Sequence, residues 1–282
     1  MMLGRRSLLG AMAGTAAFAM CESAGVAAAA RRKVKKFGIQ LYTLREAAKT
    51  DPIGVLRKLK KLGYSEVELG GPPYSTMDAR QLRRDLVRIG LTAPSMHAQM
   101  NELQADAAKV FAWGKTLGCD YVVLPYIGEE HRSTIAQCQA TAKQFTRFGA
   151  DAKAAGVVFA YHNHQFEFEP VEGKLPFDIF FDESDPALVK IELDLHWASK
   201  AKADMPAIFS KYAGRIPLCH VKDITAEGKM VAPGEGVIDF AKLFALSGQA
   251  GLVHYFVEHD NPPSPYWPTV EAAANYMKKL RY

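Results

Sequence analysis

Short runs of β-branched and aromatic residues recur along the chain, separated by longer segments with hydrophobic residues spaced three and four apart. Val55, Leu56, Leu59 and Leu62, for example, lie on one face of a predicted helix. Most of the short runs follow closely on a glycine, the residue that most readily ends a helix in the left-handed conformation. These glycines are Gly63, Gly90, Gly118, Gly156, Gly214 and Gly251. The pattern predicts strands over 37–41, 66–69, 91–96, 121–124, 157–161, 188–193, 216–219 and 252–257.

Eight strands that alternate with helices in a chain of this length are typical of the (β/α)8 TIM barrel, an α/β fold. A doubly wound open sheet is the alternative, but it usually has fewer strands and carries a glycine-rich turn after the first one. The residues after Gln40 contain no such turn. No linker or shift in composition divides the chain, so we expect a single TIM barrel domain over residues 31–282.

Residues 1–30 are expected to form a twin-arginine signal peptide. Arg5 and Arg6 precede a short apolar, alanine-rich stretch, and the small residues at 27–30 offer a cleavage site. A buried N-terminal helix is the alternative, but the stretch is short and interrupted by glycine. Lipidation at Cys21 is disfavoured because Met20 replaces the small residue expected before such a cysteine. The sequence therefore predicts export to the periplasm, with no membrane attachment after cleavage.

The composition excludes several classes of protein. With 49% hydrophobic and 23% charged residues, the chain has the balance of an ordinary globular domain. Its apolar runs are shorter than the roughly 18–20 residues of a membrane-spanning helix. The net charge of +5 is too mild to indicate a nucleic-acid partner. Signal cleavage would leave an odd number of cysteines, which favours buried, unpaired thiols over a disulfide scaffold.

Polar residues gather where the predicted strands end, which is where TIM barrels carry their active sites. Five of the eight histidines fall at or just after strand ends, and His259 is a sixth. Asp194, His220 and Glu258 follow three successive strands, and such convergent imidazole and carboxylate groups are ligands for one divalent ion, Mn²⁺, Zn²⁺, Co²⁺ or Mg²⁺. The other polar residues at these ends are Gln40, Tyr42, Arg45, Glu66, Glu68, His97, Tyr126, His162, Asn163, His164, Glu167, Glu192, His196, Lys222, Asp223 and Asp260.

The sequence resembles the xylose isomerase-like TIM-barrel superfamily, which includes sugar phosphate isomerases and epimerases and related endonucleases. The resemblance spans essentially the whole chain after the expected signal peptide. It rests on GIQLYTLR at 38–45, GYSEVEL at 63–69, YHNHQFEF at 161–168, LDLHW at 193–197, HVKD at 220–223 and FVEHD at 256–260.

The resemblance implies a set of metal ligands. Members with a known site hold one divalent metal with a Glu after strand five, an Asp after strand six, a His after strand seven and a Glu after strand eight. Asp194, His220 and Glu258 match the last three positions. The Glu-Asn-His of the family stands here as His162-Asn163-His164, so we expect His162 to be the fourth ligand. Glu167, five residues further on, is the alternative.

The resemblance also implies the chemistry. In the epimerases, two metal-bound glutamates on opposite faces of the sugar remove and return the proton next to a carbonyl. Here Glu258 remains as a carboxylate base, and His164 or Glu167 is expected to serve the other face. We therefore expect a metal-dependent sugar isomerase or epimerase. If one base suffices, relatives with this His-Asn-His pattern imply a lyase or hydrolase that acts on 3-keto-glycosides.

We expect the substrate to be an unphosphorylated sugar or keto-sugar, because the sequence contains no glycine-rich loop that would cradle a phosphate. Substrate hydroxyl groups are expected to contact Gln40, His97, His196 and Lys222, although each of these could instead pair within the protein. Two other functions stay open: a metal-dependent endonuclease, disfavoured by the mild charge, and a non-catalytic carbohydrate-binding barrel, favoured by the replacement at position 162. A homo-oligomer is compatible with all of these readings.

Overall fold

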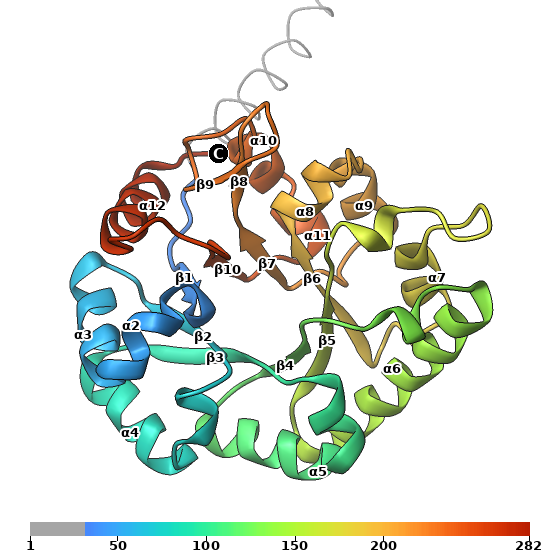
Figure 1. The fold of residues 1–282 in the computed structure, drawn as a ribbon, viewed down its shortest axis with the longest axis horizontal. Coiled ribbons are helices and arrows are strands. Elements are labelled where there is room, and N and C mark those ends of the chain that lie inside the picture. Colours follow the sequence, from blue (N-terminus) through green and yellow to red (C-terminus); the bar gives the residue numbers. More distant parts are fainter. Residues whose placement is uncertain (1–31) are drawn as a thin grey trace, which may run out of the picture.

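The computed structural model describes residues 32–282, so the expected signal peptide lies outside the described residues. Eight parallel strands close into a barrel in the order β1-β10-β7-β6-β5-β4-β3-β2, with the helices in a ring around them (Figure 1). This confirms the predicted TIM barrel. The barrel strands are β1 Gly38–Gln40, β2 Glu66–Gly70, β3 Thr92–His97, β4 Tyr121–Leu124, β5 Val158–His162, β6 Val189–Asp194, β7 Leu218–Val221 and β10 His254–Val257.

The helices follow the strands around the barrel. The α-helices are α2 Arg45–Thr50, α3 Pro52–Leu62, α4 Ala79–Ile89, α5 Met100–Leu117, α6 Ile135–Ala155, α7 Pro176–Asp182, α8 Leu195–Lys200, α9 Met205–Lys211, α10 Phe240–Ala245, α11 Ser247–Ala250 and α12 Trp267–Lys279. Short 3-10 turns cover η1 Leu41–Leu44, η2 Tyr74–Thr76, η3 Glu129–His131 and η4 Phe166–Phe168. None of the helices within residues 32–282 is both long and apolar enough to cross a membrane.

Five helices end at glycines that the sequence pattern marked as helix ends. Gly63, for example, ends α3 with φ of 95°, and its N–H donates to the carbonyls of Leu59 and Lys60. Gly90, Gly118, Gly156 and Gly251 end their helices in the same conformation. Gly214 differs, because α9 already ends at Lys211 and the glycine lies beyond its cap. Its φ of 72° serves the turn that leads into β7.

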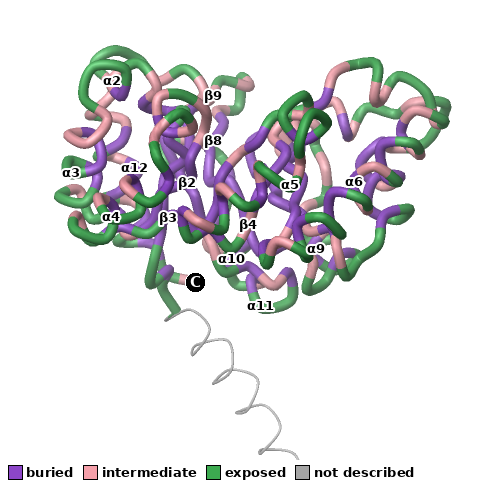
Figure 2. The backbone as a smooth tube through the Cα atoms, turned by 90° about the horizontal axis from the view of Figure 1, so that it is seen from below, coloured by how far each residue is buried: buried purple, intermediate pink, exposed green. Residues whose placement is uncertain are grey.

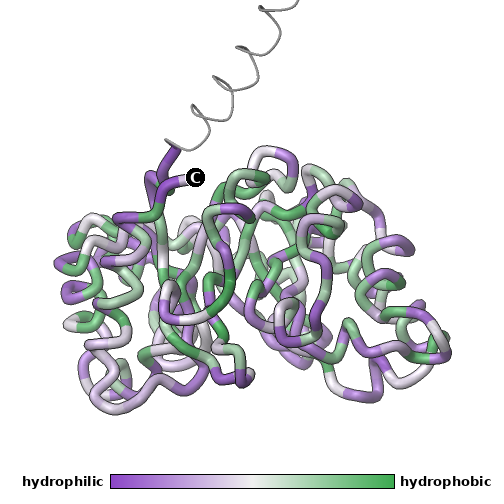
Figure 3. Tube along the Cα trace, turned by 90° about the horizontal axis from the view of Figure 1, so that it is seen from above, coloured by the Kyte–Doolittle hydropathy of each residue, from purple (hydrophilic) through white to green (hydrophobic). Residues whose placement is uncertain are grey.

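The hydrophobic core lies between the barrel and the helices. Buried residues follow the strands and the inward faces of the helices, whereas the outer helix faces are exposed (Figure 2). Hydrophobic segments follow the same inner path, and the outer turns are hydrophilic (Figure 3). Cys119, Cys138 and Cys219 are buried and unpaired, as predicted. The start and end of the described chain pair through Arg32 and Tyr282, whose backbone groups exchange two hydrogen bonds.

A small hairpin follows β7 that the hydrophobic pattern does not predict. It consists of β8 Asp223–Ile224 and β9 Met230–Val231, which pair antiparallel. The buried carboxylate of Asp223 accepts hydrogen bonds from the backbone N–H groups of Ile224, Gly234, Gly236 and Ile238. Asp223 therefore holds this loop together, at the end of the barrel where β7 delivers its polar residues.

Candidate metal centre and active site

The barrel interior is polar in the half towards the strand ends. Residues two apart on a strand point to the same face, so Glu192 and Asp194 on β6 both point inward. The same alternation places His220 and Lys222 inside at the end of β7. All four side chains are buried. Because β6 and β7 pair with Asp194 opposite His220, the two strands deliver these residues at one level.

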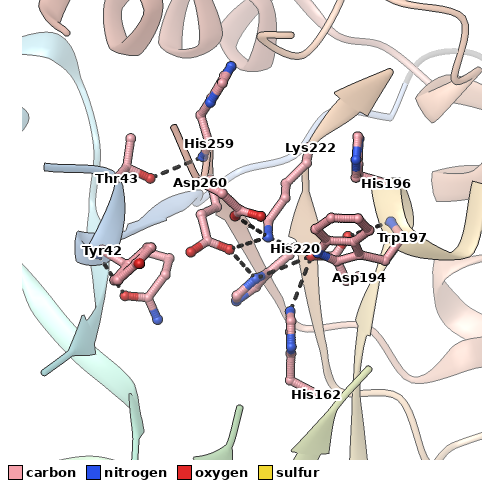
Figure 4. Close-up of polar contacts among 12 residues, drawn as sticks. Tyr42, Thr43, His162, Asp194, His196, Trp197, His220, Lys222, His259 and Asp260 are labelled. Atoms are coloured by element: carbon pink, nitrogen blue, oxygen red, sulfur yellow. Dashed lines mark hydrogen bonds and ion pairs between the residues drawn. The ribbon is translucent and has the colours of Figure 1, made fainter. Parts of the chain in front are cut away.

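Four donor atoms converge at the barrel mouth, from His162, Asp194, His220 and Glu258, all within 4.8 Å of one another. His162 Nε2 lies 3.1 Å from Asp194 Oδ2. His220 Nδ1 lies 2.7 Å from Glu258 Oε2 and 3.7 Å from Asp194 Oδ2. Figure 4 shows His162, His220 and Lys222 around Asp194. The structure thus brings together the four residues that the sequence marked as ligands.

Lys222 lies against two of these donors. Its ammonium Nζ is 2.9 Å from Asp194 Oδ2, 2.7 Å from Glu258 Oε2 and 2.7 Å from Asp260 Oδ1. The side chain is buried, so the three carboxylates supply its counter-charge. Lys222 therefore pairs within the protein, which the sequence left open, and its partners are Asp194, Glu258 and Asp260.

The carboxylates of this group are held in the charged form. Burial alone would raise the pKa of Asp194, but Lys222, His162 and His220 lower it well below its usual value. Burial likewise opposes the charged form of Glu258, yet Lys222 and His220 hold its pKa far below that of an ordinary glutamate. Deprotonated carboxylates are the form that a metal ion binds and that a general base requires.

The remaining ring nitrogens of the two histidines face acceptors. His220 Nε2 lies 2.7 Å from Glu68 Oε2, and His162 Nδ1 lies 3.3 Å from the carbonyl oxygen of Pro125. Such contacts fix the tautomer of a metal-binding imidazole, so that the inward nitrogen carries the lone pair. Two imidazoles, two carboxylates and this outer support fit a divalent cation such as Zn²⁺ or Mn²⁺.

An aromatic wall stands beside the group and surrounds His164. Its ring stacks on Phe166 at 5.4 Å, and Tyr126 and Trp197 lie 5.6 and 5.7 Å away between ring centroids. Burial lowers the pKa of His164 to about 2, so the imidazole is neutral. His164 Nδ1 and Trp197 Nε1 are buried without a hydrogen-bond partner in residues 32–282.

The other residues predicted for the site lie in three different surroundings. Gln40 donates to Glu68 and accepts from the N–H of Tyr42, so its amide is engaged inside the barrel. His97 is nearly buried between Glu68 and Glu192, below the mouth. His196 contacts the backbone carbonyl of Asp223 and stands apart from the ligand group (Figure 4). Their predicted contacts with substrate stay predictions.

Glu167 is buried, and both of its carboxylate oxygens have partners. One accepts from the hydroxyl of Tyr161 and the other from the backbone N–H of His164 at 2.7 Å. Burial raises its pKa to about 7. In this arrangement Glu167 supports the backbone of the β5 loop, and its predicted role as a second base stays a prediction.

The sequence pattern of the xylose isomerase-like TIM barrel family matches residues 56–280, which is most of the chain. The chain belongs to this family. The closed strand order and the donor atoms that converge at the strand ends define one barrel mouth.

Two of the relatives are named as an inosose dehydratase and as a sugar phosphate isomerase/epimerase. An inosose dehydratase from Geobacillus kaustophilus is 24% identical over 231 residues, covering 68% of this chain and 74% of that protein. A sugar phosphate isomerase/epimerase from Parabacteroides distasonis has a similar fold, with a TM-score of 0.78 and 24% identity over 87% of this chain and 98% of that one. The IOLI protein, solved with a bound zinc atom, has a TM-score of 0.68 at 20% identity, over 86% of this chain and 95% of that one.

Sequence reasoning placed Glu68 and Glu192 at strand ends but gave neither a role. Both are fully buried one layer below the metal group, where each lies close to His97 and His220. The spacing along β6 could have indicated a role for Glu192, because it precedes Asp194 by two residues and therefore lies on the same face of the strand. The distance from Glu192 to residues on the other side of the barrel could not be predicted, because only the closed fold defines it.

Proposed function

We propose that this member of the xylose isomerase-like family is a metal-dependent isomerase or epimerase that removes the proton next to the carbonyl of an unphosphorylated sugar or keto-sugar. The observation that carries the proposal is the buried group of His162, Asp194, His220 and Glu258 at the barrel mouth, with four donor atoms inside 4.8 Å. The names of the relatives agree with small carbohydrate or polyol substrates.

Glu258 is the base in this proposal. It follows β10 at the mouth, and its carboxylate stays ionised because Lys222 and His220 lower its pKa. A divalent ion held by these ligands would polarise a substrate carbonyl and make the neighbouring C–H more acidic. Lys222 would hold the carboxylate in place while it accepts the proton, since the ammonium lies 2.7 Å from Glu258 Oε2.

His164 is the residue we propose for the return of a proton. Its ring is neutral, and its Nδ1 has no partner within the described chain. The ring N–H would donate its own proton to the deprotonated substrate and recover one from solvent, while Glu258 would release the proton that it removed to solvent. Proton return to the other carbon gives an isomer, and return to the opposite face gives an epimer. Tyr126 is about half exposed beside His164, so it offers an aromatic face to a sugar ring.

The unpartnered nitrogens also favour an uncharged, hydroxylated substrate. His164 Nδ1 and Trp197 Nε1 would each find a partner in a substrate hydroxyl group. Lys222, the ammonium among the site residues, is already balanced by three carboxylates. Lys222 is therefore not free to bind a phosphate, which agrees with an unphosphorylated substrate.

A second outcome, elimination of a β leaving group, is favoured by a specific observation. His162 replaces the glutamate of the family, and Glu167 is tied to Tyr161 and His164, so Glu258 is the carboxylate base best placed at the mouth. An elimination needs that single base, with loss of water or of a glycosidic oxygen. This outcome agrees with the name of the inosose dehydratase relative. It also agrees with the alternative from the sequence, a lyase or hydrolase that acts on 3-keto-glycosides.

Metal content tests the site first. We expect the purified protein to hold metal that falls in Asp194→Ala, whereas Asp178→Ala, in a partly exposed ion pair with Lys211, keeps it. Glu258→Gln should retain most of the metal and lose roughly 10²–10⁴-fold in turnover, as expected when a general base is removed. Wild-type turnover in Glu258→Gln would place the base elsewhere.

Incubation with sugars, inososes and 3-keto-glycosides in D₂O separates the two outcomes. A product that is an isomer of the substrate and carries deuterium on carbon supports the isomerase or epimerase. An unsaturated or cleaved product supports elimination. Metal-loaded protein that exchanges no proton of any of these compounds would favour a carbohydrate-binding role.

We also propose that the chain is exported, on the strength of Arg5, Arg6 and the alanines at 27–30. Replacement of both arginines by lysine should leave the protein in the cytoplasmic fraction at full length. Unchanged fractionation of that variant would contradict the proposal. A homo-oligomer remains compatible with the fold and is tested by the mass of the purified protein in solution.

A further inference from the structure

A second group of donors lies below the first, on the other side of the same imidazole. It consists of Glu68, His97, Glu192 and His220, whose ligand atoms also lie within 4.8 Å of one another. His220 presents Nδ1 to Asp194 and Glu258 and Nε2 to Glu68 and Glu192. The lower group, which we call the inner cluster, uses none of His162, Asp194 or Glu258.

The inner cluster is a closed ring in which nitrogen and oxygen alternate. His97 Nε2 lies 3.2 Å from Glu68 Oε2 and 3.0 Å from Glu192 Oε2. His220 Nε2 lies 2.7 Å from Glu68 Oε2 and 3.2 Å from Glu192 Oε2. In a flat square with edges near 3 Å the centre lies about 2.1 Å from each corner, which is the length of a zinc–nitrogen or zinc–oxygen bond, and a folded ring brings the centre closer.

Hydrogen bonds account for only half of this ring. Each Nε2 carries at most one hydrogen, and these hydrogens serve His97–Glu192 at 3.0 Å and His220–Glu68 at 2.7 Å. The two approaches at 3.2 Å, His97–Glu68 and His220–Glu192, are left without a hydrogen. Glu192 is fully buried, and its second oxygen, Oε1, has no hydrogen-bond partner within residues 32–282. An unpartnered buried carboxylate oxygen is costly unless a further group satisfies it.

The ligands are held in place and can be reached. Gln40 donates to one oxygen of Glu68 and Ser95 to the other, which fixes the plane of that carboxylate. His97 lines a cavity of about 360 Å³ that extends along α5 past Met96 and Trp113. His97 is thus the member of the ring that can be reached from the side of β3, whereas Glu68, Glu192 and His220 are fully buried.

We propose that Glu68, His97, Glu192 and His220 bind a second divalent cation, of the zinc, cobalt or manganese class, in addition to the one proposed at the mouth. When both sites are filled, His220 serves both through its two ring nitrogens, and its remaining ring proton is released to solvent. The proposal goes beyond the proposed function, because the inner cluster can bind metal whether or not the upper group is catalytic.

Metal stoichiometry after titration with Co²⁺ and removal of free ion tests the proposal. The wild type should hold about two ions per chain, and Glu192→Gln and His97→Asn about one each. Glu66→Gln is the matched control, because Glu66 lies on the same strand but pairs with His254 at 2.9 Å, outside the ring. That variant should keep both ions.

The outcomes separate the two sites. Loss of one ion in Asp194→Ala and of a different one, with a distinct visible absorption spectrum, in Glu192→Gln supports both. One ion in the wild type that survives Asp194→Ala but not Glu192→Gln supports the inner cluster and contradicts the metal-dependent function. One ion that survives Glu192→Gln and is lost in Asp194→Ala overturns the inner cluster. The wild-type titration gives the stoichiometry even if a variant fails to fold, and saturation at one ion with the spectrum of the mouth site overturns the proposal.

Discussion

Lys222→Met isolates the charge at the barrel mouth. Lys222 Nζ lies 2.7–2.9 Å from oxygens of Asp194, Glu258 and Asp260, and the side chain is buried. Methionine has a similar volume but no charge, so the metal-free variant leaves two buried ligand carboxylates without their cation. Removal of one partner of a buried ion pair costs about 3–5 kcal/mol. For a chain of this size, each kcal/mol lowers Tm by about 2–4 °C, so we expect a fall of roughly 6–20 °C in EDTA.

A bound divalent ion should reduce this fall in Tm, because it supplies the positive charge that is missing in Lys222→Met. We expect the loss of Tm to be less than half as large in saturating Zn²⁺ or Mn²⁺, and the variant to bind the ion more tightly, as measured by calorimetry. Lys211→Met is the matched control: Lys211 also contacts two carboxylates, of Asp178 and Asp182, but is exposed and should cost at most about 1 kcal/mol. Equal destabilisation of Lys222→Met with and without metal, or weaker metal binding, would refute the reasoning.

Two further predictions concern the interior. Burial raises the pKa of Glu167 from 4.5 to about 7, so the folded chain binds this proton more tightly than the unfolded chain and loses stability as pH rises through that window. We compare the free energy of unfolding of the wild type and Glu167→Gln by denaturant titration between about pH 4.5 and 7.5. The difference between the two free energies should change by roughly 3 kcal/mol across this range. A difference that does not change with pH would contradict this prediction. Gly149→Ala should destabilise by about 1–3 kcal/mol, because a Cβ there would lie 2.7 Å from the carbonyl oxygen of Leu188. In Gly248→Ala, where a Cβ meets nothing within 4 Å, thermal unfolding should be nearly unchanged, and equal losses in both variants would count against the packing argument.

The barrel, and the positions of most residues of the candidate site, could be predicted from the sequence. Alternating strand and helix periods are local properties, so the positions of the strands, and of helix ends such as Gly63, can be read without the fold. The same holds for Asp194, His220 and Glu258, because parallel strands of a barrel deliver their ends to one mouth.

The tertiary structure decided which charges meet. Lys222 pairs with three carboxylates, those of Asp194, Glu258 and Asp260. The carboxylate of Glu167 accepts a hydrogen bond from the backbone N–H of His164 in the loop after β5. The sequence motifs allowed other partners for both side chains. The inner cluster depends on the distance between β2 and β7, which lie on either side of the β1–β10 pair in the closed barrel. The alternation of residues along a strand predicts which side chains point into the barrel. Which side chains they then contact depends on how the barrel closes and on the register between its strands. Closure and register are long-range properties of the fold, so no local pattern in the chain contains them.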